Sequence, residues 1–241
     1  MTAGRLEAGQ GKAVVFDFYG TLSNPHVELD RAAAYAATGR ALGVDGDDFW
    51  HEMWTSFPER VVGGLGSTRE TLNAIAVRCG HRPTDCQLDR ALALHLETAE
   101  ILRSPRPGGL EVLDRIRLVG LQIGLLSDCS SELAEAWETT PYAPRMDAAV
   151  FSWRLGVRKP DARTFLEVTA ALDVAPSDCW YVGDGGSREL WGANRLGMTT
   201  VLVRNAAYGV AHLRVDADAQ KPAYAVDDLT EVPDLVLGSR I

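Results

Sequence analysis

Short apolar runs alternate with amphipathic segments along much of this chain. Five runs have the length and composition of buried parallel strands: Ala13–Phe18, Leu121–Leu126, Ala148–Phe151, Trp180–Val182 and Thr199–Val203. Between the later runs, apolar positions recur with the spacing of helices, over Gly109–Leu118, Ser131–Glu138, Ala162–Leu172 and Arg188–Leu196. Alternation of strands and helices predicts an α/β fold, with a doubly wound parallel sheet of the Rossmann-like type.

One long stretch departs from this alternation. From about Asn24 to Ser104 the pattern predicts helices only, over Glu28–Leu42, Asp47–Phe57, Thr68–Cys79 and Gln87–Leu102. Turn-rich segments bound the stretch on both sides. We therefore expect a Rossmann-like catalytic core at residues 12–23 and 105–241, with an all-helical cap domain, residues 24–104, inserted after the first strand.

Composition limits the kinds of molecule that this protein is expected to bind. The chain has 241 residues and a net charge of −9, which disfavours binding to nucleic acid or to an anionic membrane. A small anionic substrate remains compatible, because a pocket can be locally positive. The polar N-terminus, the lack of a membrane-spanning apolar run and four cysteines without a Cys-x-x-Cys pattern predict a cytoplasmic protein with reduced thiols and no structural zinc. The oligomeric state is not indicated.

The first apolar run ends in a segment that points to chemistry. Asp17-Phe18-Tyr19-Gly20-Thr21 follows it directly. Ligands of parallel α/β sheets bind beyond the carboxyl ends of the strands, so Asp17 is a candidate nucleophile. The segment resembles the first motif of the haloacid dehalogenase superfamily, in which Mg²⁺-dependent phosphatases have Asp-x-Asp-x-Thr. Tyr19 replaces the second Asp, a form typical of the 2-haloacid dehalogenase branch.

Three later segments resemble the other motifs of that superfamily. Ser127 closes an apolar run, Lys159 lies in a Lys-Pro-Asp sequence, and Asp184 precedes Glu189 by five residues in a glycine-rich turn. Each also has an ordinary structural explanation. A serine after a strand can cap a helix, a lone lysine is usually a surface group, and an acid is favourable near a helix N-terminus.

The resemblance extends from about Ala13 to Val236 and implies specific roles. Catalytic roles are implied for Asp17, Tyr19, Thr21, Ser127 and Lys159. Substrate contacts are implied for Gly20, Ser127, Asp128 and Lys159. Mg²⁺, a hard cation that takes oxygen ligands, is implied to bind the carboxylates of Asp17, Asp184 and Glu189 and the main-chain carbonyl of Tyr19.

The first functional hypothesis is a Mg²⁺-dependent phosphatase that acts on a small phosphorylated metabolite. Asp17 would attack phosphorus, and water would then hydrolyse the aspartyl phosphate. Tyr19 weakens this hypothesis, because a phenol with a pKa near ~10 is a poor base. We therefore expect low activity on poor leaving groups, or proton transfer by another residue or the substrate.

Two alternatives stay open at this point. A 2-haloacid dehalogenase, in which Asp17 attacks carbon, is favoured by Tyr19. That branch usually has Asn at Asp128, Tyr at Phe165 and Ser-Ser-Asn in place of Gly183-Asp184-Gly185. Two acids beside the nucleophile would also repel a carboxylate substrate unless a metal neutralised them. A non-catalytic binding protein with the same fold is the third hypothesis, and the joint presence of all four motifs argues against it.

An aromatic stripe in the helical stretch is the remaining feature. Phe49, Trp50, Trp54 and Phe57 recur at near-helical spacing. Such a stripe usually belongs to a hydrophobic core. If part of it lines the cleft, it favours an aromatic or apolar part of the substrate, which the sequence does not otherwise identify.

Overall fold

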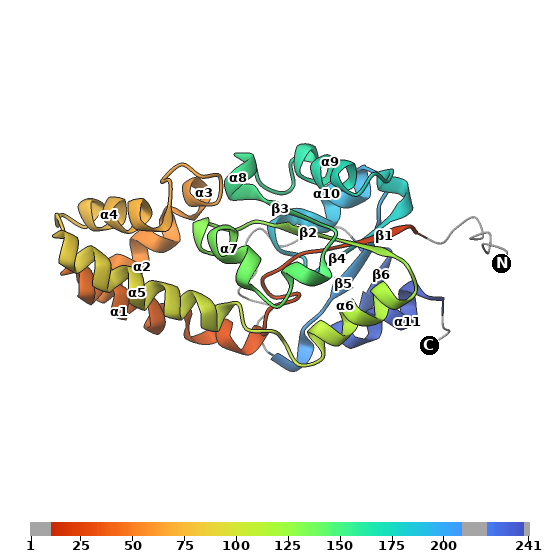
Figure 1. The fold of residues 1–241 in the computed structure, drawn as a ribbon, viewed down its shortest axis with the longest axis horizontal. Coiled ribbons are helices and arrows are strands. Elements are labelled where there is room, and N and C mark those ends of the chain that lie inside the picture. Colours follow the sequence, from red (N-terminus) through yellow and green to blue (C-terminus); the bar gives the residue numbers. More distant parts are fainter. Residues whose placement is uncertain (1–10, 209–220, 239–241) are drawn as a thin grey trace.

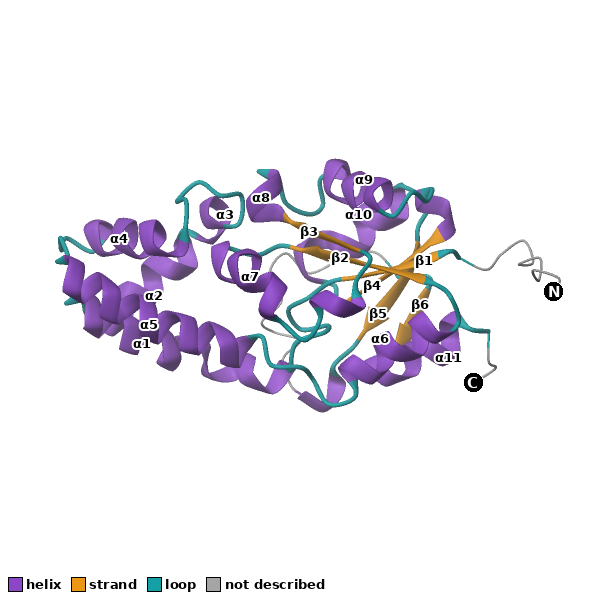
Figure 2. Ribbon diagram, in the orientation of Figure 1, coloured by secondary structure: helices purple, strands orange, loops and turns teal. Residues whose placement is uncertain are grey.

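A computed structural model of the chain describes residues 11–208 and 221–238. Figures 1 and 2 show an elongated molecule, with a helical segment (residues 24–104) on one side and a helix-flanked sheet on the other. Most of the polar N-terminal stretch, for which we expect no signal sequence, lies outside the described residues. Among the residues described, no helix is long and apolar enough to cross a membrane.

The sheet is parallel throughout, and its strands follow the order β3-β2-β1-β4-β5-β6. The predicted α/β, Rossmann-like fold is therefore confirmed. The strands are β1 (Ala13–Phe16), β2 (Gln122–Ser127), β3 (Ala148–Phe151), β4 (Cys179–Gly183), β5 (Thr199–Val203) and β6 (Tyr224–Val226). The edge strand β6 was not expected from the sequence, because three residues give too short a pattern to distinguish from a loop.

Helices cover both faces of the sheet, as Figure 1 shows. They are α6 (Gly109–Leu118), α7 (Ser131–Ala136), α8 (Ser152–Leu155), α9 (Ala162–Ala171), α10 (Glu189–Arg195) and α11 (Val232–Val236). Val14 and Phe16 pack with the apolar side chains of α6 and α11, while Ala13 and Val15 pack with those of α9 and α10. Successive residues of β1 thus pack into the hydrophobic cores on opposite faces of the sheet, which explains why the run is apolar at every position.

The helical segment contains α1 (Arg31–Leu42), α2 (Gly46–Thr55), α3 (Phe57–Arg60), α4 (Thr68–Arg78) and α5 (Asp85–Leu102). Capping boxes from Ser67 to Glu70 and from Thr84 to Gln87 start α4 and α5. The helix expected from Glu28 begins instead at Arg31, after a 3₁₀ helix. Short 3₁₀ helices lie at Pro25–Asp30, Trp137–Thr139, Ala143–Arg145, Pro176–Asp178, Gly186–Arg188, Ala206–Tyr208 and Leu229–Glu231.

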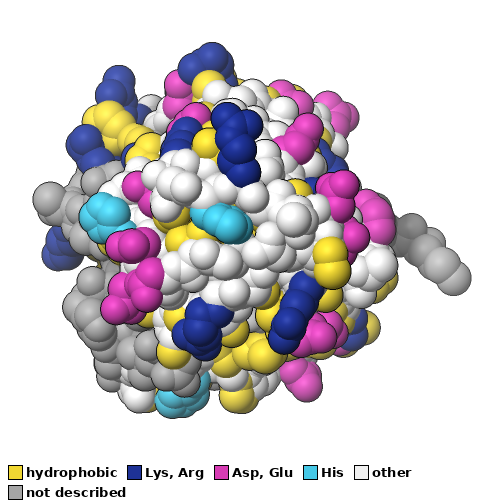
Figure 3. All heavy atoms as spheres, turned by 90° about the vertical axis from the view of Figure 1, so that its left-hand side faces the viewer, with side chains coloured by type: hydrophobic (Ala, Val, Ile, Leu, Met, Phe, Trp, Pro, Cys, Tyr) yellow, Lys and Arg dark blue, Asp and Glu magenta, His cyan; other side chains and the backbone are white. Residues whose placement is uncertain are grey.

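The end of the helical segment that is far from the sheet carries charges of both signs. Figure 3 shows acidic and basic side chains interspersed over this face. Elsewhere in the helical segment, Arg69 of α4 pairs with Asp85 of α5 at 3.1 Å and also with Asp89. Exposed pairs of this kind contribute little to stability, so packing of the apolar faces holds these helices together.

Candidate active site

The register of the sheet brings three of the predicted site residues to one edge. Strand β1 lies between β2 and β4, and Phe16 is paired with both Leu125 and Val182. Asp17, which follows β1, is therefore flanked by Ser127 at the end of β2 and by Asp184 just after β4. The backbone N–H of Asp17 donates to the carbonyl of Val182 at 2.9 Å, which continues the ladder into the site.

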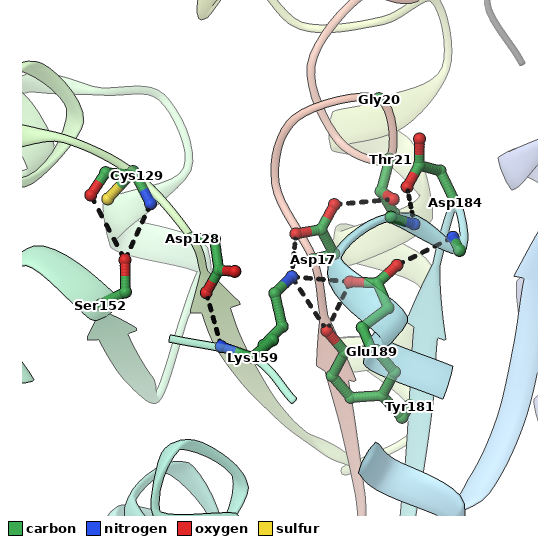
Figure 4. Close-up of polar contacts among 12 residues, drawn as sticks. Asp17, Gly20, Thr21, Asp128, Cys129, Ser152, Lys159, Tyr181, Asp184 and Glu189 are labelled. Atoms are coloured by element: carbon green, nitrogen blue, oxygen red, sulfur yellow. Dashed lines mark hydrogen bonds and ion pairs between the residues drawn. The ribbon is translucent and has the colours of Figure 1, made fainter. Parts of the chain in front are cut away.

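The ammonium of Lys159 contacts two carboxylates at this edge of the sheet. Its buried ammonium donates to Asp17 Oδ1 at 2.6 Å, to Glu189 Oε2 at 2.6 Å and to the Tyr181 hydroxyl at 3.3 Å (Figure 4). The backbone N–H of Lys159 donates to Asp128 Oδ1 at 3.0 Å, which holds the segment in place. Burial alone would lower the pKa of Lys159, but the charges of Asp17 and Glu189 outweigh it and hold that pKa well above its ordinary value.

Glu189 and Asp184 complete an acidic cluster with Asp17. Oxygens of these three carboxylates lie within 4.8 Å of one another. Glu189 Oε1 accepts from the N–H of Gly185 at 2.9 Å, and Oε2 accepts from Lys159 and from the Tyr181 hydroxyl at 2.9 Å. Burial and the charges of Asp17 and Asp184 outweigh Lys159 and raise the pKa of Glu189.

This donor set fits a divalent cation. Two of the three clustered carboxylates, those of Asp17 and Glu189, share a single ammonium, and oxygen is the ligand atom that hard cations prefer. The backbone of the loop after β1 passes close to Asp184: a Cβ added at Gly20 (φ +77°) would lie 2.7 Å from Asp184 Oδ2. Glu189 already accepts three hydrogen bonds, so direct ligation by it would require one of them to be given up.

Two predicted hydroxyl groups, those of Thr21 and Ser127, belong to the segments that end at this edge of the sheet, but neither residue is part of the cavity lining described below. Thr21 Oγ1 donates to Asp17 Oδ2 at 3.2 Å. The Ser127 side chain is fully buried, and its hydroxyl has no hydrogen-bond partner among the residues that the structure describes. The helix-capping explanation for Ser127 does not hold, since Ser130 occupies the N-cap position of α7. An unpaired buried hydroxyl is costly, and a bound ligand can satisfy it.

Tyr19 faces the helical segment. Its ring packs edge-on against Phe18 with centroids 5.0 Å apart, and the guanidinium of Arg31 lies 5.3 Å from its centroid. Burial, followed by the charges of Cys129 and Glu132, raises the pKa of Tyr19 well above its ordinary value, and Arg31 opposes this only in part. The Tyr19 phenol therefore remains protonated near neutral pH and is no base.

A cavity of about 460 Å³ lies over this cluster. On the sheet side it is lined by Asp17, Lys159 and Asp184, together with the predicted substrate contacts Gly20 and Asp128. Its other wall comes from helices of the helical segment. The structure thus brings candidate residues from four separate motifs to one partly open cavity.

The comparisons with known proteins agree with this arrangement. The family model for haloacid dehalogenase-like hydrolases matches residues 12–197. The chain belongs to this family. Over 231 residues it is 29% identical to a glyceraldehyde 3-phosphate phosphatase of Methanopyrus kandleri, which covers 93% of this chain and 97% of that protein. It is 27% identical to a ribulose-1,5-bisphosphate 5-phosphatase of Halopiger xanaduensis, over 93% of this chain and 98% of that protein.

The fold is also that of a solved dehalogenase. An L-2-haloacid dehalogenase of Xanthobacter autotrophicus superposes with a TM-score of 0.64 at 22% identity, over 95% of this chain and 99% of that one. At this identity the likeness shows the fold alone. Phosphatases and dehalogenases therefore both occur among the proteins similar to this hydrolase.

Several residues that support the site in this hydrolase were not predicted. Tyr181 looked like an ordinary core residue of a buried strand, yet its hydroxyl bridges Lys159 and Glu189. Asn205 Nδ2 donates to the carbonyl of Gly20 at 2.6 Å, and a guanidinium nitrogen of Arg106 donates to that of Thr21 at 2.9 Å. These two side chains hold the loop after β1. They come from distant segments, so no local pattern reveals them.

A buried pair joins the helical segment to the core of this hydrolase. His95 Nε2 of α5 lies 2.8 Å from Glu132 Oε1 of α7, and both side chains are buried. Burial alone would raise the pKa of Glu132, but the hydrogen bond and charge of His95 and the charge of Arg60 outweigh it, so the pKa lies well below its ordinary value. The ionised carboxylate is thus the form that the fold stabilises.

Replacing Glu132 with Gln should make stability less dependent on acid pH. Because folding depresses the pKa of Glu132, its contribution is present above the ordinary carboxyl pKa and is lost as pH falls below it. We expect the variant to be less stable by about 1–3 kcal/mol near pH 7, with the difference shrinking between about pH 5 and pH 3. Urea unfolding followed by tryptophan fluorescence measures both values.

Glu97→Gln, at an exposed position of α5, is the matched control for this measurement. It should differ little from the unmodified protein at either pH. A constant difference between Glu132→Gln and the unmodified protein down to pH 3 would contradict the expected linkage.

Proposed function

We propose that this hydrolase is a Mg²⁺-dependent phosphatase of a small phosphorylated organic molecule, with Asp17 as the nucleophile. The observation that carries the proposal is the acidic cluster of Asp17, Asp184 and Glu189 beside the ammonium of Lys159. A phosphate dianion needs cations next to an attacking carboxylate. The displacement of halide from an uncharged carbon does not. The phosphatase names of two relatives support the same choice.

Each side chain then has a defined task. Asp17 forms a bond to phosphorus while the ester oxygen leaves, and a water molecule later cleaves the aspartyl phosphate. Lys159 and the hydroxyl of Ser127 bind phosphate oxygens, and Thr21 orients the carboxylate of Asp17. Gly20 and Asp128 border the bound substrate. Tyr19 contributes its main-chain carbonyl rather than its phenol.

The cation site is formed by Asp17, Asp184, the carbonyl of Tyr19 and, directly or through water, Glu189. Bound Mg²⁺ would neutralise phosphate charge as it develops. Lys159 supplies the remaining positive charge, and its contact with Glu189 and Tyr181 keeps the ammonium directed at Asp17.

Replacing Asp184 with Asn tests the metal requirement. Phosphate release from 4-nitrophenyl phosphate and from a panel of phosphorylated metabolites should fall by about 10²–10⁴-fold, because cation stabilisation is worth several kcal/mol. EDTA should lower phosphate release by the unmodified protein to a similar extent, and excess Mg²⁺ should restore the activity. The control is Asp85→Asn, since the Asp85 side chain is 94% exposed and distant in sequence from every motif.

The dehalogenase alternative is tested in parallel. Halide release from 2-chloropropionate should be absent under the same conditions. Halide release that survives EDTA, together with no turnover of any phosphate ester, would overturn the proposed function in favour of a dehalogenase. No turnover of either substrate class would favour a non-catalytic protein.

A further inference from the structure

The cavity joins two chemically different walls. Asp17, Lys159 and Asp184 line its sheet side, and the rings of Trp50 and Trp54 line the side of the helical segment. A volume of about 460 Å³ lies within the range that accommodates drug-sized molecules. It offers room well beyond a phosphate group, so the shape and chemistry of the second wall indicate what the phosphate is attached to.

The aromatic stripe of α2 divides between core and cavity. Phe49 and Met53 are 0% and 1% exposed and belong to the core of the helical segment. Trp50 and Trp54 lie one helical turn apart on the cavity side, and Trp54 is 55% exposed. Phe49 thus belongs to the core, as such stripes usually do, while Trp54 lines the cavity, which is the case that the sequence left open.

These cavity-lining rings form a contiguous aromatic cluster. Tyr35 is stacked with Trp50, with centroids 5.8 Å apart and an interplanar angle of 16°, and also with His95 at 5.0 Å. Trp54 follows at 6.1 Å from Trp50, with its ring tilted by 47°. Phe57 lines the cavity as well. Large, rigid rings such as these bind other planar apolar groups by stacking. We refer to Tyr35, Trp50 and Trp54 as the aromatic wall.

Two polar side chains next to the aromatic wall, Arg60 and Thr55, are already engaged. Arg60 donates through Nε to Ser56 Oγ, through one terminal nitrogen to Ser130 Oγ at 2.7 Å and through the other to the carbonyl of Met53 at 2.7 Å. The hydroxyl of Thr55 donates to the carbonyl of His51 at 2.9 Å. A polyhydroxylated substrate would lose hydration without gaining these partners, and a planar apolar group would not.

Each carboxylate that lines the cavity has at least one polar partner, although Asp128 Oδ2 accepts no hydrogen bond among the described residues. Asp17 and Glu189 accept from Lys159, Glu132 lies against His95, and Asp128 and Asp184 accept from backbone N–H groups. Tyr19 presents its ring to the helical segment. Residue 19, where the resemblance implies a second carboxyl group in phosphatases, thus directs no carboxyl group at the leaving oxygen, and a leaving group that departs without needing a proton suits such a site. Phenols, with a pKa of about 10, leave far more readily than alcohols, which resemble water at about 15.7.

From these two observations we propose that the substrate is the phosphate monoester of a planar phenol, whose ring lies against the aromatic wall while its phosphate lies at Asp17. The proposal rests on the phosphatase function above and names the substrate class of that same site. Asp17 forms its bond to phosphorus as the bond to the phenolic oxygen breaks, and the phenolate leaves with the electron pair and takes a proton from water. A second water molecule then attacks the aspartyl phosphate, which releases inorganic phosphate and restores the carboxylate.

Binding is tested apart from turnover. Isothermal titration calorimetry with Mg²⁺ present compares benzylphosphonate, whose carbon–phosphorus bond resists hydrolysis, with methylphosphonate. Benzylphosphonate should bind about three- to ten-fold more tightly, and Trp50→Leu and Trp54→Leu should each remove most of that advantage without changing methylphosphonate binding. Leu96→Ala is the control, because Leu96 is an exposed residue of α5 outside the cavity lining. Equal binding of the two phosphonates, or no effect of either tryptophan variant, would overturn the proposal.

Turnover tests the leaving group. Phenyl and 1-naphthyl phosphate should be hydrolysed with a kcat/KM at least about 10²-fold above that of glycerol 3-phosphate, and the rate should rise steeply with the acidity of the phenol across a series of substituted phenyl phosphates. Equal rates for aryl and alkyl esters would overturn the substrate class while the phosphatase function stood. If no phosphate ester were hydrolysed but benzylphosphonate still bound through Trp50, the phosphatase function would fail and the aryl site would stand.

Discussion

Asp17→Asn should abolish phosphate release from every substrate, by at least about 10⁴-fold. An amide is too weak a nucleophile to form the phosphorylated intermediate. The replacement removes one of the three clustered carboxylates and keeps its shape, so the variant should be at least as stable as the unmodified protein. Phosphate release assays and thermal unfolding measure the two effects separately.

The same experiment has a positive counterpart. Mass spectrometry of the acid-quenched unmodified protein during turnover should find a phosphate on the peptide that contains Asp17, and none should be found in the variant. Thr21→Val is the graded control, because it removes only the 3.2 Å hydrogen bond to Asp17 Oδ2 and should cost far less activity. Turnover that persists in Asp17→Asn would show that another group attacks phosphorus.

Lys159→Met should impair both folding and catalysis. The change leaves the buried carboxylates of Asp17 and Glu189 without their cation, and removal of one partner from a buried ion pair costs about 3–5 kcal/mol. Activity should also be lost, since the site then has no fixed positive charge beside the phosphate. Chemical unfolding and a phosphate release assay with saturating Mg²⁺ check the two parts.

Two further variants isolate the charge of Lys159 from its packing. Tyr181→Phe removes a hydroxyl that contacts the same ammonium but leaves all charges in place, and it should cost only about 1 kcal/mol. The double variant Asp17→Asn/Lys159→Met removes one charge of each sign and should recover part of the stability lost in Lys159→Met. No recovery in the double variant would mean that the loss comes from packing around the aliphatic stem of Lys159.

The aromatic wall and the replacement at residue 19 belong to the same chemical argument. Tyr19 provides a phenol where the resemblance in the sequence implies a second carboxyl group for phosphatases, and its ring packs toward the helical segment. Trp50 and Trp54 provide a surface for a planar leaving group. A substrate that needs little help in leaving can be turned over by a site without that carboxyl group.

Much of the fold could be predicted because its signals are local. The uninterrupted apolar run at Ala13–Phe16 indicates a strand covered on both faces, and strand–helix alternation indicates a parallel sheet. Asp17, Ser127 and Asp184 could be proposed together because the carboxyl ends of parallel strands share an edge. The predicted first residues of helices were less exact. The helix expected from Glu28 begins at Arg31, because caps and short 3₁₀ helices shift helix starts by a few residues.

The sequence by itself therefore determined the α/β architecture, the nucleophile candidate and the acidic residues beside it, because strand periodicity and the order of motifs are properties of the chain. Only the tertiary structure decided which side of the α2 stripe faces the cavity, that Tyr181 bridges Lys159 and Glu189, and that His95 reaches Glu132. These contacts join segments far apart in the chain. Their existence depends on the packing of whole helices against the sheet, which no local pattern of residues encodes.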